Sequence, residues 1–219
     1  AAFNRLMGID VHELSPREVG ELFPPARVDD ILAGFYVKED GRANPVDVTM
    51  ALAKGAKLRG AKLVEGVAVT GVRTRAGAVV GVETTHGAVQ CEVVVNCAGM
   101  WARELGLLNN INIPLQAAEH YYLITGPMAG ISRDWPVLED PASYGYYREE
   151  GGGLMIGLFE PEAAAWKVEG VPKDFSFGEI EPDWERMTPF LEKAMARVPA
   201  AQDAGIKTLF CGPESFTPD

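Results

Sequence analysis

The sequence has little that would attach it to a membrane or to a polyanion. No apolar run approaches the ~18 residues that cross a bilayer, and the start, AAFNRLMGIDVHEL, has neither the basic nor the apolar region of a signal peptide. Basic residues number only 20 against 31 acidic ones, a net charge of −11. The electrostatic field of this negative charge repels polyanions. We therefore expect no nucleic acid and no membrane as partner, and expect a small molecule instead.

Cysteine and histidine are also scarce. Cys91, Cys97 and Cys211 form no C-x-x-C pair, which indicates reduced thiols and a cytoplasmic protein rather than a disulfide framework. The three histidines show neither H-x-x-x-H nor H-E-x-x-H spacing, so we expect no metal site. They are His12, His86 and His120.

What the chain does have is the composition of a folded protein. Its 219 residues are 47% hydrophobic and 23% charged, which is the globular average. That length suits one large domain or two small ones and can bury a core. Disordered and low-complexity architectures are therefore excluded.

Two helix starts are marked near the beginning of the chain. Ser15-Pro16 followed by Glu18 predicts a capped helix that Pro24-Pro25 ends. Asn44-Pro45 precedes apolar residues at helical spacing and predicts a helix over 45–59.

β-rich runs follow this second helix and predict a three-stranded meander. They begin at Val67, Val79 and Val89. The last of them ends in the continuous apolar run 92–96, which suggests a strand buried on both faces. It leads into a glycine turn and a short helix that we expect Gly106 to cap.

The second half has an antiparallel pattern. Extended segments are predicted over 115–125, 144–148, 154–159 and 206–211. Gly151 to Gly153 reads as a hairpin turn, since no G-x-G-x-x-G or P-loop spacing occurs. A last helix follows Pro182, and Pro189 predicts that it starts late or is kinked. The fold class is therefore mixed, α+β and α/β.

The turn after the run 92–96 is the first candidate site. Ala98 and Gly99 would let bare backbone approach a phosphate or a flavin. An ordinary strand-to-helix connection explains the same residues, and Trp101 taken alone is typical of a core.

The second candidate site combines two strands. Alternation places His120 and Tyr122 on one face, and Tyr144, Tyr146 and Arg148 on one face of the next strand. An imidazole, a phenol and a guanidinium that converge would suit a small amino acid, with one group handling the amine proton and another binding the carboxylate. An amphipathic sheet with aromatic cross-strand pairs and a solvated arginine is the alternative.

Four motifs, in this order, make the chain recognisable. They are V-V-V-N-C-A-G-M-W-A-R-E-L-G (93–106), A-E-H-Y-Y-L-I-T (118–125), Y-Y-R (146–148) and C-G-P-E-S-F-T-P-D (211–219). The chain resembles the dimethylglycine dehydrogenase and sarcosine dehydrogenase family, flavin amine dehydrogenases of the D-amino-acid-oxidase superfamily. G-P-E-S-F-T-P-D leans towards the sarcosine branch.

The resemblance implies an internal fragment of a larger protein. The family opens with a strand and a G-x-G-x-x-G turn, and continues past this chain with a folate-binding region; the chain has neither. We therefore expect a partial FAD-binding domain over 1–112, an antiparallel substrate-binding domain over 113–205, and a truncated return to the flavin domain over 206–219. The whole protein would bind FAD and, in a further region, tetrahydrofolate. These residues alone would bind FAD weakly or not at all.

Site residues are implied position by position. The backbone of Val67 would lie by the adenine end of FAD. Ala98, Gly99 and Trp101 would border the cofactor. His120 and Tyr146 fall on the family's substrate-side histidine and tyrosine and would be catalytic. Arg148, which shares a face with Tyr146, would bind the substrate carboxylate, with Tyr122 also at the substrate.

The implied reaction is oxidative demethylation of sarcosine or dimethylglycine by hydride transfer to the flavin, in the cytoplasm or, in a eukaryote, the mitochondrial matrix. Both substrates stay open, as do oxygen and an electron-transfer protein as electron acceptor. The alternative is a non-catalytic relative similar to the regulatory subunit of pyruvate dehydrogenase phosphatase. A related amino-acid or glycerol-phosphate flavin oxidase ranks third.

Overall fold

The computed structural model describes residues 2–218 and divides into two compact units. The first unit is made of 2–42, 120–163 and 179–212, and the second of 43–119, 164–178 and 213–218. Each unit therefore consists of segments that are distant in the sequence. The domain boundaries expected above concern the whole protein and stay a prediction.

The helices and strands are short, apart from two helices of 14 residues and the long strands β6 and β10. The helices are α1 (Ala2–Leu6), α2 (Pro16–Leu22), α3 (Pro45–Leu58), α4 (Ala102–Leu107) and α5 (Trp184–Arg197), with 3-10 turns at Gly99–Trp101 and Pro199–Ala201. The strands are β1 (His12–Leu14), β2 (Gly34–Tyr36), β3 (Val69–Arg75), β4 (Ala78–Thr84), β5 (Gly87–Val89), β6 (Gln116–Thr125), β7 (Leu138–Asp140), β8 (Gly145–Glu150), β9 (Gly153–Leu158) and β10 (Ile206–Phe216).

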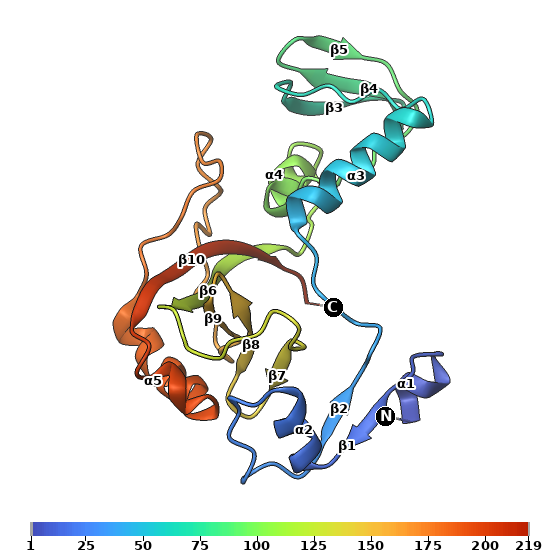
Figure 1. The fold of residues 1–219 in the computed structure, drawn as a ribbon. Helices are drawn as coiled ribbons and strands as arrows, with labels where there is room; N and C mark the ends of the chain where they lie inside the picture. The colour runs from blue at the N-terminus through green and yellow to red at the C-terminus, as the bar shows by residue number, and fades with distance from the viewer. Residues whose placement is uncertain (1, 219) are drawn as a thin grey trace. The chain divides into compact units, whose positions relative to one another are not determined.

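A five-stranded sheet in the order β10-β6-β9-β8-β7 carries the core of the first unit (Figure 1). Side chains alternate along its strands, so each strand offers one face to the core. Tyr121, Tyr147 and Ile156 are fully buried, and they form one cluster with Met187 and Leu191 of α5. The predicted antiparallel sheet is confirmed, and its other face stays half-exposed.

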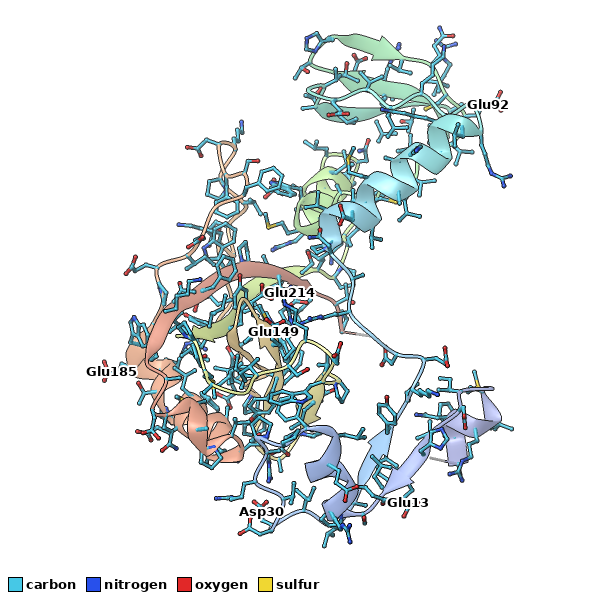
Figure 2. All side chains as sticks on the ribbon, in the orientation of Figure 1. Glu13, Asp30, Glu92, Glu149, Glu185 and Glu214 are labelled. Carbon is cyan, nitrogen blue, oxygen red and sulfur yellow. The ribbon has the colours of Figure 1, made fainter. Side chains whose placement is uncertain are left out.

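The turn between β8 and β9 is the predicted hairpin. Glu150 pairs with Gly153, and the two linking residues, Gly151 and Gly152, both have positive φ. Glycine adopts that backbone without strain, and it matches the twist of the strands. The buried carboxylate of Glu149 accepts a hydrogen bond from the Gly152 amide, which fixes the turn (Figure 2).

A buried ion network joins the end of α5 to two other segments of this unit. The Arg197 guanidinium, 8% exposed, donates from Nε to Asp140 at 2.7 Å and from Nη1 to Asp30. Nη1 also donates to the carbonyl of Arg27. Such a paired charge is costly to break, so the network fixes the segment before β2 against α5.

Both helix starts predicted near the beginning are confirmed. Ser15 and Glu18 form a reciprocal capping box at α2, and the Asn44 side chain accepts from two amides at the start of α3. The last helix, α5, begins at Trp184 behind the cap of Asp183 and includes Pro189. It therefore does not start late.

The second unit contains the predicted three-stranded meander, in the order β3-β4-β5. The third strand is Gly87–Val89, however, and the prediction of a doubly buried strand over 92–96 is wrong. Val93 and Val95 are 74% and 78% exposed. An apolar run becomes a strand only where a neighbour pairs with its backbone, and no strand of residues 2–218 pairs with this one.

The predicted cap at Gly106 is also wrong. The helix α4 continues to Leu107, and Gly106 is buried within it. A Cβ on Gly106 would lie 2.7 Å from the carbonyl oxygen of Ile111. The glycine therefore permits close packing of the following chain rather than a helix end.

Among residues 2–218, no helix combines the length and the apolar character that a membrane span requires.

Candidate active site

The half-exposed face of the sheet in the first unit carries the substrate-side residues predicted from the sequence. Tyr122 of β6 and Tyr146 of β8 both pair with Gly157 of β9, one from each side. Strand spacing puts their Cα atoms roughly 10 Å apart. Arg148 follows Tyr146 on the same face by alternation, and His120 precedes Tyr122. The structure thus brings these four predicted residues to one face.

The ring of Tyr146 lies directly over Gly157. A Cβ built on Gly157 would overlap the Tyr146 ring carbons and hydroxyl. Every other side chain of β9 beyond Gly153 is bulky and apolar. The missing side chain is therefore what lets the phenol lie across the middle strand.

A phenylalanine links the two predicted catalytic residues. The Phe159 ring lies 5.4 Å from the His120 ring and 5.2 Å from the Tyr146 ring, both at tilted angles. Phe159 is nevertheless 51% exposed. Three rings therefore form one aromatic surface that stays open to a ligand.

Arg148 is held by a neighbour on its own strand. Its Nη1 lies 2.6 Å from Oε2 of Glu150, two residues along, and both side chains are half-buried. A substrate carboxylate that binds this guanidinium would either share Arg148 with Glu150 or displace Glu150 from it. Arg148 has further N–H groups for a second acceptor.

Tyr122 is a phenol that stays protonated at neutral pH. Burial raises its pKa, as do the carboxylates of Glu179 and Glu150, while Arg148 lowers it. Its ring stacks on Phe210 of β10, with 4.6 Å between centroids. Tyr122 can therefore donate a hydrogen bond from a fixed position.

The prediction that Tyr144 shares the face of Tyr146 and Arg148 is wrong. Tyr144 precedes β8 and has a positive φ of 56°. Its ring packs on Phe190 and under the ammonium of Lys193, both on α5. Alternation fails there because the strand has not yet begun.

The residues predicted to border the cofactor all belong to the second unit. Val67 is half-buried just before β3. Gly99 starts the 3-10 turn with φ of 55°, and a Cβ on it would meet open space. The Asn96 side chain braces the turn, because it accepts from the Ala98 amide and donates to the Ala102 carbonyl. Trp101 is 39% exposed and is therefore not a core residue.

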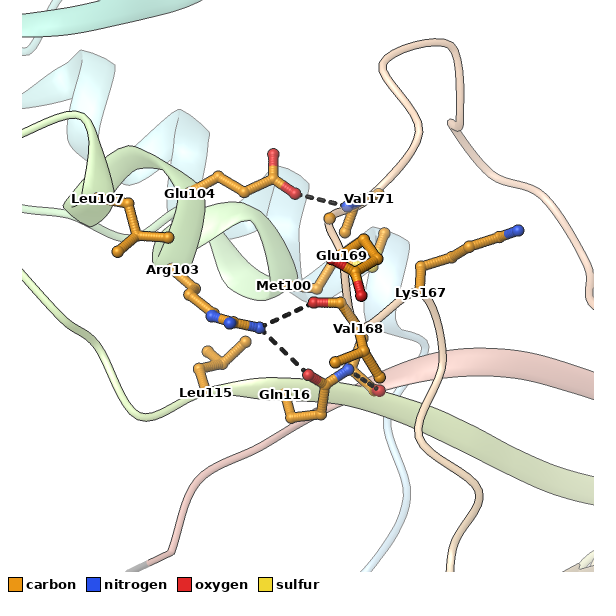
Figure 3. A pocket seen from close by; sticks show the side chains of 12 residues that line it. Met100, Arg103, Glu104, Leu107, Leu115, Gln116, Lys167, Val168, Glu169 and Val171 are labelled. Atoms are coloured by element: carbon orange, nitrogen blue, oxygen red, sulfur yellow. Dashed lines mark hydrogen bonds between the residues drawn. The ribbon is translucent and has the colours of Figure 1, made fainter.

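A small cavity of about 60 Å³ lies beside α4 in the same unit (Figure 3). Its polar groups are already used: Arg103 donates to the Gln116 side chain and the Val168 carbonyl, and Glu104 accepts from the Val171 amide. Ligand pockets usually exceed about 300 Å³. We therefore interpret the cavity as a small packing space, around which hydrogen bonds hold the segment 167–171 against α4.

Comparison with known proteins decides the family. The family described as FAD dependent oxidoreductase (DAO) matches residues 1–219. The chain belongs to this family. The chain is 39% identical over 223 residues to mitochondrial sarcosine dehydrogenase of Mus musculus, and the match covers all of this chain and 24% of that protein.

Other relatives are similar over a comparable share of their length. The chain is 36% identical over 214 residues to mitochondrial dimethylglycine dehydrogenase of Rattus norvegicus, and the match covers 94% of this chain and 25% of the relative. It is 36% identical over 217 residues to the mitochondrial pyruvate dehydrogenase phosphatase regulatory subunit of Mus musculus. This match covers 98% of the chain and 25% of that protein. The chain thus spans about a quarter of the curated relatives it matches.

The fold of the chain is similar to that of a solved dehydrogenase. The crystal structure of L-proline dehydrogenase from P. horikoshii superposes with a TM-score of 0.81 at 24% identity, over 98% of this chain and 55% of that one. The expected D-amino-acid-oxidase-like fold is therefore confirmed.

The turn from Ala98 to Trp101 has features that would suit the border of a flat cofactor. Its backbone at Gly99 is bare, and beside it stand the small Ala98 and the partly exposed indole of Trp101. An aromatic face and backbone that no side chain covers are groups that a flavin can contact.

Sequence reasoning missed three residues that lie beside Tyr146, Arg148 and His120 on this sheet face. The missed residues, which contact the predicted ones, are Phe159, Gly157 and Glu150. Only Gly157 gave a signal in the sequence, because it is a glycine inside an apolar strand. Such a glycine indicates close approach of another group. The positions of Phe159 and Glu150 depend on register, which the turn and the pairing determine.

Proposed function

We propose that the whole protein is an FAD-dependent dehydrogenase that removes a methyl group from sarcosine or dimethylglycine. The observation that carries this proposal is the sheet face on which an imidazole of β6 and a phenol and a guanidinium of β8 stand on either side of β9. The similarity to enzymes named for these two substrates supports it.

Each group has a task that its chemistry suits. Arg148 binds the substrate carboxylate through charge-assisted hydrogen bonds. His120 accepts the proton of the substrate ammonium, which frees the nitrogen lone pair. Tyr146, fixed over Gly157, orients the amine by donating or accepting a hydrogen bond through its hydroxyl.

FAD, when bound, supplies the acceptor for a hydride. Val67, Ala98, Gly99 and Trp101 would border it. With the nitrogen lone pair free, the C–H bond of the N-methyl group could give up a hydride to that acceptor while the lone pair forms a C=N bond. Hydrolysis of this iminium, or its capture by tetrahydrofolate, would then release the methyl carbon. The aromatic surface around Phe159 offers the N-methyl group an apolar contact.

A histidine variant of the intact enzyme tests the proposal. His120→Ala should lower turnover by about 100-fold and change the pH profile of kcat/KM, because general bases contribute about 10²-fold to 10⁴-fold. The matched control is His86→Ala, which lies in the turn between β4 and β5. An unchanged pH profile in the His120 variant would reject its role as proton acceptor.

A second candidate function is non-catalytic, as in the pyruvate dehydrogenase phosphatase regulatory subunit, and the 36% identity to that protein favours it. The same experiment separates the two, since a regulatory protein would show no N-methylglycine-dependent turnover in any variant. For the enzyme, tetrahydrofolate as the one-carbon acceptor, an electron-transfer protein or oxygen as oxidant, and a cytoplasmic or mitochondrial matrix location are further parts of the proposal.

A further inference from the structure

An unbroken series of contacts runs across the substrate face from β9 to β6. Gly157 underlies the Tyr146 ring, that ring contacts Phe159, and Phe159 contacts His120. The two proposed catalytic side chains are thus spaced by one phenylalanine and one glycine. Neither residue takes part in proton transfer.

From this arrangement we infer that Gly157 is a positioning residue, which sets where the Tyr146 hydroxyl meets the substrate amine. The inference rests on the proposed function. The middle strand β9 therefore does more than pair with its neighbours. Because Gly157 has no side chain, it leaves the volume that the Tyr146 ring occupies.

The composition of β9 supports this role. Its other residues from Leu154 to Leu158 are buried and apolar, as expected of a central strand. Glycine in the interior of a strand costs about 0.5 to 1 kcal/mol relative to alanine. At Gly157 the cost has a visible cause, because any Cβ would occupy the volume of the Tyr146 ring.

Alanine at position 157 would force the phenol away from the strand. The three atoms nearest to the missing Cβ all belong to the ring and hydroxyl of Tyr146. The displaced ring would lose its contact with Phe159, and with it the spacing to His120. Misplacement of a reacting group by ~1 Å can lower a rate about 100-fold.

A double-mutant cycle in the intact enzyme tests whether Gly157 acts through Tyr146. We expect Gly157→Ala to lower kcat/KM for the N-methyl amine by about 10-fold to 100-fold. In a Tyr146→Ala background the same change should cost less than about twofold, because no ring is left to displace. Equal losses in both backgrounds would overturn the inference.

A second readout does not depend on turnover. Nitration of Tyr146 by tetranitromethane, followed by peptide mass spectrometry, should be faster in Gly157→Ala because the ring is pushed towards solvent. Nitration of Tyr36, in the two-stranded sheet, serves as internal reference. An unchanged rate at Tyr146 would overturn the positioning role even if activity fell.

The matched control is Gly71→Ala. Gly71 is also in a strand, but a Cβ there would meet nothing within 4 Å, so rates of turnover and nitration should stay unchanged. If Gly157→Ala fails to fold while the double variant folds, the ring overlap is supported; if both fail, it is overturned. Absence of amine oxidation by the wild type would reject the proposed function alone, since nitration still tests the placement of Tyr146.

Discussion

At the scale of single residues, the ion-paired Arg148 on β8 is the group that we propose determines how tightly the substrate carboxylate binds. Arg148 is half-buried and already paired with Glu150 at 2.6 Å. A charge-assisted hydrogen bond contributes about 1.5 to 3 kcal/mol. Arg148→Met should therefore raise the KM for the amino-acid substrate by about 10-fold to 100-fold and change kcat much less, as steady-state kinetics will measure.

The matched control for Arg148→Met is Arg17→Met on α2. Arg17 also pairs with a glutamate, Glu21, but its side chain is 87% exposed. Exposed pairs of this kind contribute little, so KM should not change. A KM that stays constant in both variants would contradict the assignment of Arg148 as carboxylate anchor.

At the scale of elements, a buried phenol joins the sheet to α5. Tyr147 is fully buried, donates to the Ala194 carbonyl at 2.8 Å and lies 3.0 Å from the Ser143 hydroxyl. Removing a buried hydrogen-bonding partner costs about 1 to 3 kcal/mol. Tyr147→Phe should lower the free energy of unfolding by that amount at pH 7, as urea denaturation will measure.

The same phenol predicts a change at alkaline pH. Burial raises the pKa of Tyr147 to about 12, above its ordinary value of about 10. A raised pKa in the folded state stabilises the protein fully below pH ~10 and loses that effect as the pH rises towards 12. The difference between wild type and Tyr147→Phe should shrink over that range. Tyr36→Phe is the control, and a difference independent of pH would contradict the account.

At the scale of the whole molecule, local signals predicted most elements. The caps at Ser15 and Asn44 and the glycines of the β8–β9 hairpin gave the right elements because their chemistry acts within a few residues. The run 92–96 and Gly106 were misread because burial and close packing depend on segments distant in the sequence.

The candidate site could be predicted only in part for the same reason. Strand alternation placed Tyr146 with Arg148, and the resemblance singled out His120, but neither showed that Phe159 lies between them or that Gly157 underlies the phenol. Those contacts follow from the pairing of β6, β9 and β8. Pairing is set by the whole sheet rather than by any one segment.

We propose that the whole protein oxidises N-methylated glycine with FAD. The most direct measurement is the visible absorbance of the intact, FAD-loaded protein, kept free of oxygen, while sarcosine, dimethylglycine or unmethylated glycine is added. We predict that the band of oxidised flavin bleaches with one or both methylated substrates and not with glycine. A band that persists with all three would contradict the account.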